Sequence, residues 1–161
     1  MRTLYAVSVG AQIALWSLML SPATAAGLPT DDPTLPPFQE RTSAYIDRCE
    51  KAESHVEQGN CLSDQIKSLR IRINAEMKKR LAEAEELAAD PPSGGKSGAE
   101  KAAIVKADRR KAQAAWEAYT KAMCGAVGRE ISIDGGNGGD IFQGRCEIRH
   151  YVARYNEIRG R

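Results

Sequence analysis

The stretch CLSDQIKSLRIRINAEMKKRLAEAEEL, residues 61–87, decides the fold of this chain. Its apolar residues recur every three or four positions, which places them on one face of a long helix. These residues are Leu62, Ile66, Leu69, Ile73, Met77, Leu81, Ala84 and Leu87. The segment 90–95, with two prolines and two glycines, ends the helix. We therefore expect one long amphipathic helix between Cys61 and about Leu87.

A second long helix follows this linker. Ser97-x-x-Glu100 fits a capping box, in which two side chains satisfy backbone N–H groups at a helix start. The apolar residues expected on one side of this helix are Val105, Ala112, Trp116, Tyr119 and Met123. A short linker between two long amphipathic helices favours an antiparallel hairpin.

Shorter helices are expected on both sides of the hairpin. Residues 39–52 carry apolar side chains at helical spacing, whereas the polar residues 53–60 predict a turn or a loose helical end. Six glycines between Cys124 and Asp140 predict an irregular loop. Asp140-x-x-Gln143 can cap a final helix. Its apolar side is formed by Ile141, Ile148, Val152, Tyr155 and Ile158.

The N-terminus resembles an export signal. Arg2 precedes an apolar stretch over residues 4–20, and small residues follow, so that cleavage fits after Ala25 or Ala26. An uncleaved anchor helix is disfavoured because the apolar stretch is short. We expect a signal peptide over 1–25, a proline-rich extended leader over 26–38, and a helical domain over 39–161. The mature protein would be periplasmic or secreted.

Composition excludes several classes of protein. The 161 residues carry 23 Lys and Arg against 21 Asp and Glu, a net charge of +2, and loss of Arg2 leaves the mature chain at +1. This near-neutral charge gives no electrostatic case for binding nucleic acid. The 42% of hydrophobic residues exclude a wholly disordered chain, and the length excludes a large multi-domain enzyme. No membrane span is expected after cleavage.

The chain has four cysteines, Cys49, Cys61, Cys124 and Cys146. An even number of cysteines in a protein outside the cytoplasm is most simply explained by pairing, so we predict two disulfides. A zinc site is the rival interpretation, but the spacings fit no metal-binding motif, and His55 and His150 add no paired ligand. Three connectivities are possible. Local pairing closes the smallest loops and is slightly preferred. An antiparallel hairpin would gather all four sulfurs at one pole, with the linker at the other.

No catalytic residues, metal site or cofactor are predicted. Gly95-Lys96-Ser97 lacks the preceding glycine and strand of a phosphate loop, and residues 135–143 hold a single copy of a calcium-binding repeat that works only in stacks. Trp116 is interpreted as a core residue. A basic patch for an acidic partner, or simply a solvated helix face, is formed by Arg145, Arg149, His150 and Arg154.

The chain resembles the lysozyme inhibitor LprI-like family (N-terminal domain) of small exported bacterial proteins. The resemblance extends from about Tyr45 to Ile158. It is carried by Cys49-x2-Ala52-x4-Glu57-x3-Cys61, by Gln113-x2-Trp116-x7-Cys124, and then by Cys146, Arg154 and Ile158. The chain departs from the family at Thr120, where an Arg is usual, and at Tyr151, where a Thr is usual. A target touched at those positions would differ from the target of other members.

The resemblance implies inhibition of lysozyme, which cleaves peptidoglycan with two carboxylates in a cleft. A disulfide-tethered loop between Cys124 and Cys146 could plug that cleft at low entropic cost. Its candidate residues are Glu130, Asp134, Gly135, Gly136, Asn137, Gly138, Gly139 and Asp140. The alternative is a non-inhibitory periplasmic or envelope interaction module, and a hydrolase is disfavoured for lack of a catalytic set. The oligomeric state stays open.

Overall fold

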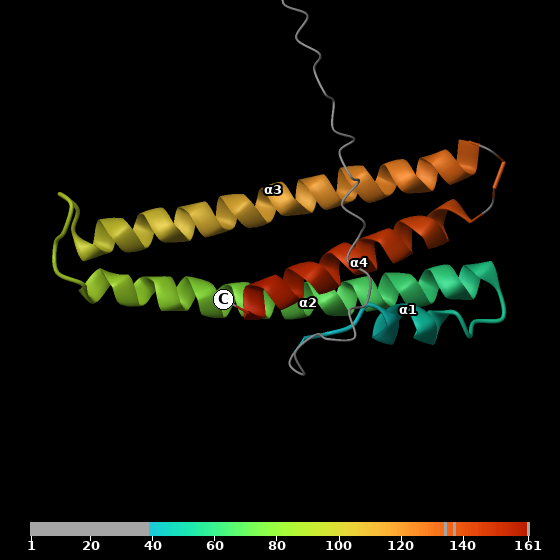
Figure 1. The fold of residues 1–161 in the computed structure, drawn as a ribbon, viewed down its shortest axis with the longest axis horizontal. Helices are drawn as coiled ribbons and strands as arrows, with labels where there is room; N and C mark the ends of the chain where they lie inside the picture. Colours follow the sequence, from blue (N-terminus) through green and yellow to red (C-terminus); the bar gives the residue numbers. More distant parts are fainter. Residues whose placement is uncertain (1–38, 134, 137, 161) are drawn as a thin grey trace, which may run out of the picture.

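The computed structural model describes residues 39–133, 135, 136 and 138–160, and these residues form the predicted all-α fold (Figure 1). In chain order the helices are α1 (Ser43–Cys49), α2 (His55–Glu86), the short 3-10 helix η1 (Leu87–Ala89), α3 (Gly98–Ile133) and α4 (Gly139–Arg159). The predicted signal peptide, residues 1–25, and leader, residues 26–38, lie outside this part. None of these helices combines the length and the apolar character needed to cross a bilayer.

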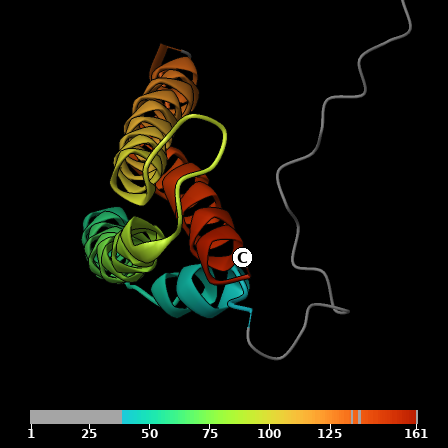
Figure 2. The ribbon, with the colours of Figure 1, turned by 90° about the vertical axis from the view of Figure 1, so that its left-hand side faces the viewer.

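The two long helices α2 and α3 run antiparallel, as predicted, with their linker at the left of Figure 1 and the α3–α4 turn at the right. The last helix, α4, crosses obliquely between them and packs against both. Figure 2 shows α4 in the angle between α3 and the α1–α2 pair. The molecule is therefore a hairpin that is held open by its own C-terminal helix.

The core lies where α1, α2 and α4 meet. Its buried residues are Tyr45, Ile46 and Cys49 of α1, Leu62, Ile66, Leu69 and Ile73 of α2, and Ile141, Ile148, Tyr151, Val152, Tyr155 and Ile158 of α4. The stripe predicted on α2 is thus confirmed over its first half, and Ala84 is buried farther along. Burial of such side chains contributes roughly 1.5–3 kcal/mol each, which makes this three-helix contact the main source of stability.

The apolar side predicted for α3 is wrong. Tyr119 and Met123 are exposed, and Trp116 is only partly buried. The residues of α3 that are buried are Gly98, Ala102, Gln113, Thr120, Cys124 and Gly128. They are small or polar, and at two of them the reason is a close approach. A Cβ atom at Gly128 would lie 2.9 Å from the carbonyl oxygen of Gly139 in α4, and one at Gly98 would lie 2.6 Å from the carbonyl oxygen of Leu87 in η1.

Two segments predicted as turn or loop are helical. The helix α2 begins at His55 because Ser54 caps it, with its Oγ accepting from the N–H of Glu57 at 3.2 Å. Residues 53–60 are therefore mostly its first turns. The helix α3 continues through Ile133, so that residues 125–133, which were predicted to lie in an irregular loop, are helical. The first short helix was predicted over residues 39–52, whereas the observed α1 covers only Ser43–Cys49.

The linker between η1 and α3 is fixed by a capping box and a glycine. As predicted, Glu100 accepts a hydrogen bond from the N–H of Ser97 at 2.8 Å, and its own N–H donates to Ser97 Oγ at 3.3 Å. A Cβ atom at Gly98 would lie 2.6 Å from three carbonyl oxygens at residues 87, 88 and 90. No side chain fits at residue 98. Because glycine has none, α3 can start directly against η1.

The cysteines form Cys49–Cys61 and Cys124–Cys146, the local pairing that was preferred from the sequence. The first pair joins the end of α1 to α2, and the second joins α3 to α4. Cys61 lies near the start of α2 and Cys124 near the end of α3, so both disulfides lie in the half of the bundle away from the linker.

Candidate binding site at the tip of the helix pair

The end of α3 and the start of α4, of which the structure describes residues 130–133, 135, 136 and 138–142, lie next to each other, and we call these described residues the tip below. The disulfide Cys124–Cys146, with 5.5 Å between its Cα atoms, ties the two helices together below the tip. At the end of α3 the N–H groups of Gly135 and Gly136 donate to the carbonyl oxygens of Ser132 and Ile131, each at 3.2 Å. Gly135 has a φ of +80°, a conformation that favours glycine.

The tip is closely packed rather than a loose loop. A Cβ atom at Gly139 would lie 2.5 Å from the carbonyl oxygen of Gly128 and would also collide with Ser132 Oγ. The glycines at 128 and 139 therefore serve helix-to-helix contact. Asp140 was predicted to cap α4, but the N-cap is Gly138 and no side chain caps this helix. Asp140 instead lies against Gly59 of α2, where a Cβ atom would be 2.9 Å from its carboxylate.

The structure divides the predicted loop residues among three elements. Glu130 lies on α3, Gly135 and Gly136 in the turn, and Gly139 and Asp140 in the first turn of α4, while Asp134 and Asn137 lie outside the described residues. Glu130 and Asp140 are both exposed. The tip thus retains an acidic character on a helical frame.

Two apolar residues of the tip were missed by the sequence reasoning. Ile133 is 81% exposed and Phe142 is 46% exposed. Each is separated from the glycine-rich turn by no more than a few residues, and neither belongs to a buried stripe. That combination was the available signal. Exposed apolar residues beside acidic ones suit contact with another protein.

Three of the four residues of the predicted basic patch contact other side chains of the same chain. Arg145 pairs with Glu50 at 3.0 Å, and Arg154 pairs with Glu157 at 2.7 Å. His150 is partly buried, packs edge-on against Tyr119, and has its pKa lowered by that burial. Because two of its arginines neutralise carboxylates, the patch is not a continuous free cationic surface.

The Gln113-x2-Trp116 motif joins α3 to α4. Gln113 accepts from Arg154 Nε at 3.0 Å and donates to Glu117 at 2.9 Å. Trp116, which was predicted to be a core residue, is partly buried and packs against the core, edge-on to Tyr151 with 5.1 Å between the ring centroids. Thr120, one turn farther along α3, is buried, and its hydroxyl has no hydrogen-bond partner. These residues explain the architecture rather than a chemical activity.

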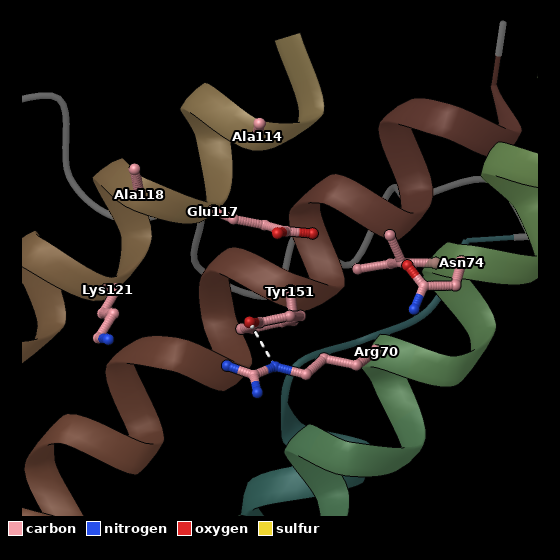
Figure 3. A pocket seen from close by; sticks show the side chains of 8 residues that line it. Arg70, Asn74, Ala114, Glu117, Ala118, Lys121 and Tyr151 are labelled. Atoms are coloured by element: carbon pink, nitrogen blue, oxygen red, sulfur yellow. Dashed lines mark hydrogen bonds between the residues drawn. The ribbon is translucent and has the colours of Figure 1, made fainter. Parts of the chain in front are cut away.

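Apart from the tip, a groove of about 440 Å³ lies between α2 and α3, and Tyr151 of α4 forms part of its lining (Figure 3). Arg70 Nε donates to the Tyr151 hydroxyl at 2.7 Å, and this hydrogen bond raises the pKa of Arg70. Glu117 and Lys121 line the groove from α3. The groove carries mixed charge and could not be predicted from the sequence, because its residues come from three helices.

Comparison with known proteins identifies a family. The sequence matches the family model described as Lysozyme inhibitor LprI over residues 47–158. This span contains both disulfides, the whole of α2 and α3, and nearly all of α4. No curated protein and no solved structure shows a significant match.

Proposed function

Because the chain belongs to the lysozyme inhibitor LprI family, we propose that it inhibits a lysozyme and that its tip enters the cleft of that enzyme. Lysozymes hydrolyse peptidoglycan with two carboxylates in a cleft. The protein itself acts as a binding protein and not as an enzyme. The observation that carries this proposal is the exposed apolar pair Ile133 and Phe142 on a closely packed, disulfide-linked helix pair.

Rigidity supports this proposal. The disulfide and the contact between Gly128 and Gly139 restrict the tip before any partner arrives. An ordered binding surface loses less conformational entropy when it binds, so that more of the contact energy appears as affinity. Ile133 and Phe142 would supply apolar contact. Glu130 and Asp140 would face cationic groups at the rim of the cleft, because a net charge of +1 gives the mature chain no long-range attraction to a basic enzyme.

The two disulfides and the family indicate an extracytoplasmic protein. We further propose a cleaved signal peptide over residues 1–25 and a periplasmic or secreted location. Export of the full chain from a bacterial host, followed by intact-mass measurement, should give a mature N-terminus at Ala26 or Gly27 with four oxidised cysteines. Recovery of the uncut chain in the membrane fraction would instead support an anchor.

An inhibition assay with the oxidised mature protein and several lysozymes tests the role of the tip. The double variant Ile133→Ala/Phe142→Ala should weaken inhibition at least roughly tenfold, because truncation of central apolar contacts costs 1 kcal/mol or more each. The matched control is Ile71→Ala/Ile104→Ala, whose side chains on α2 and α3 are 71% and 45% exposed. This control should inhibit like the unmodified protein.

Other outcomes would point elsewhere. Unchanged inhibition by Ile133→Ala/Phe142→Ala would place the inhibitory surface outside the tip. No inhibition of any lysozyme, together with a native envelope partner recovered by crosslinking, would favour the interaction module. Release of soluble peptidoglycan fragments by the protein alone would favour a hydrolase.

A further inference from the structure

Three metal-binding side chains meet beneath the tip. The sulfur atoms of Cys124 and Cys146 and one ring nitrogen of His150 all lie within 4.8 Å of one another. No other group of three or more His, Cys, Asp or Glu residues in the described ranges brings its ligand atoms together in this way. The sequence concealed this cluster, because Cys124 reaches the other two residues only through the packing of α3 on α4.

The surroundings suit a soft metal ion. Both cysteines are buried, and His150 Nε2 is shielded from solvent with no hydrogen-bond partner. Burial also lowers the pKa of His150, which favours the neutral ring that a metal requires. Cys146 and His150 are four residues apart on α4, one helical turn, so both point to the same side. Cys124 faces them from α3.

We propose that, after the Cys124–Cys146 disulfide is reduced, Cys124, Cys146 and His150 bind a zinc ion that links α3 to α4 in its place. A dithiol supplies the two electrons: the S–S bond breaks, each cysteine gains a proton, and the dithiol becomes a disulfide. Binding then releases both thiol protons, and two thiolates, one imidazole and a water complete a tetrahedral site. This inference does not depend on lysozyme inhibition.

The distances make such a site reachable. With Zn–S bonds of about 2.3 Å and a Zn–N bond of about 2.0 Å, tetrahedral ligand atoms lie roughly 3.5–3.8 Å apart. After reduction the two sulfurs are free to separate by rotation of their side chains, and the three ligand atoms already lie within 4.8 Å of one another, about 1 Å more than the tetrahedral spacing.

The other disulfide, Cys49–Cys61, provides a matched control. Cys49 and Cys61 also join two helices with 5.5 Å between their Cα atoms. However, no histidine or carboxylate of the described residues is grouped with them as a third ligand. A pair of thiols alone should bind zinc more weakly than a pair that is completed by an imidazole.

Cobalt titration of the reduced protein tests the site. The mature variant Cys49→Ser/Cys61→Ser is refolded without oxygen in the presence of a phosphine reductant, and Co²⁺ is added as an optical probe. We expect one Co²⁺ per chain with a thiolate-to-cobalt absorption band, displaced by Zn²⁺. In the Cys49→Ser/Cys61→Ser background, His150→Ala should weaken Co²⁺ binding at least tenfold, and His150→Cys should retain it. The reduced variant Cys124→Ser/Cys146→Ser should bind Co²⁺ at least tenfold more weakly than reduced Cys49→Ser/Cys61→Ser.

Three results would overturn the proposal. The first is unchanged affinity in His150→Ala, and the second is equal affinity in the two cysteine-pair variants. The third is failure of the reduced Cys49→Ser/Cys61→Ser protein to show a helical circular dichroism spectrum with Zn²⁺ present, because a bound ion is expected to support the fold.

Discussion

At the scale of single residues, Arg72 connects three parts of the chain. Its guanidinium hydrogen-bonds Glu40 and the Tyr45 hydroxyl, and it lies over the Tyr155 ring, 4.3 Å from the centroid. Next to it, the Asn156 side chain exchanges two hydrogen bonds of 2.8 Å with the backbone of Glu40. One arginine of α2 therefore holds the segment before α1 and the end of α4 in the same place.

This cluster predicts a pH-dependent stability. The hydrogen bond from Arg72 is the main reason that the pKa of Glu40 lies below its usual 4.5. A lowered pKa in the folded state means that the carboxylate stabilises the fold above pH 4.5, and that this contribution disappears as the pH falls through the lowered value. Glu40→Gln should cost about 1 kcal/mol at neutral pH. Urea unfolding at several pH values should show the difference shrinking in acid, and a constant difference would contradict the assignment.

At the scale of elements, the start of α3 depends on a missing side chain. Gly98→Ala would place a methyl group 2.6 Å from three carbonyl oxygens, which cannot all move without disturbing η1. We expect a loss of roughly 2 kcal/mol or more in the free energy of unfolding. Gly125→Ala is the control, because its Cβ atom would meet only the flexible end of Arg129 at 3.2 Å. This control should be neutral or gain up to about 1 kcal/mol from helix propensity. Thermal unfolding of both variants measures the contrast.

The elements also show how far sequence reasoning reaches. The stripe of α2 was predictable because Leu62, Ile66 and Leu69 face an aliphatic and aromatic core, where hydrophobicity decides orientation. On α3 the same rule chose Tyr119, but the narrow space beside α4 selects Thr120. Close packing is a property of two helices together and leaves little trace in either one alone.

The helix ends were mispredicted for a related reason. Gly59 lies within α2 and Gly128 within α3, although glycine lowers helix propensity by about 1 kcal/mol. Both glycines admit an approaching segment of α4, and tertiary packing offsets the unfavourable local preference. For the candidate site, the sequence located the acidic residues and the disulfide. It could not show that helices carry them.

At the scale of the whole molecule, the disulfides should have distinct effects. Loop-closure entropy assigns about 3 kcal/mol to each, because the sequence separations of 12 and 22 residues are similar. Cys124→Ser/Cys146→Ser should therefore lower the free energy of unfolding by about that amount and speed amide hydrogen exchange over residues 125–145. Cys49→Ser/Cys61→Ser should lower stability similarly but speed exchange around α1. Identical exchange maps for the two variants would contradict this separation.

The position of α4 has a consequence for how the protein is made. Among the described residues, thirteen buried side chains form the main core, and six of them belong to α4. During synthesis, α2 and α3 emerge before α4 and have no complete apolar surface to pack against. The native core can close only after α4 has been synthesised, so α1 and α2 stay without most of their packing partners until then.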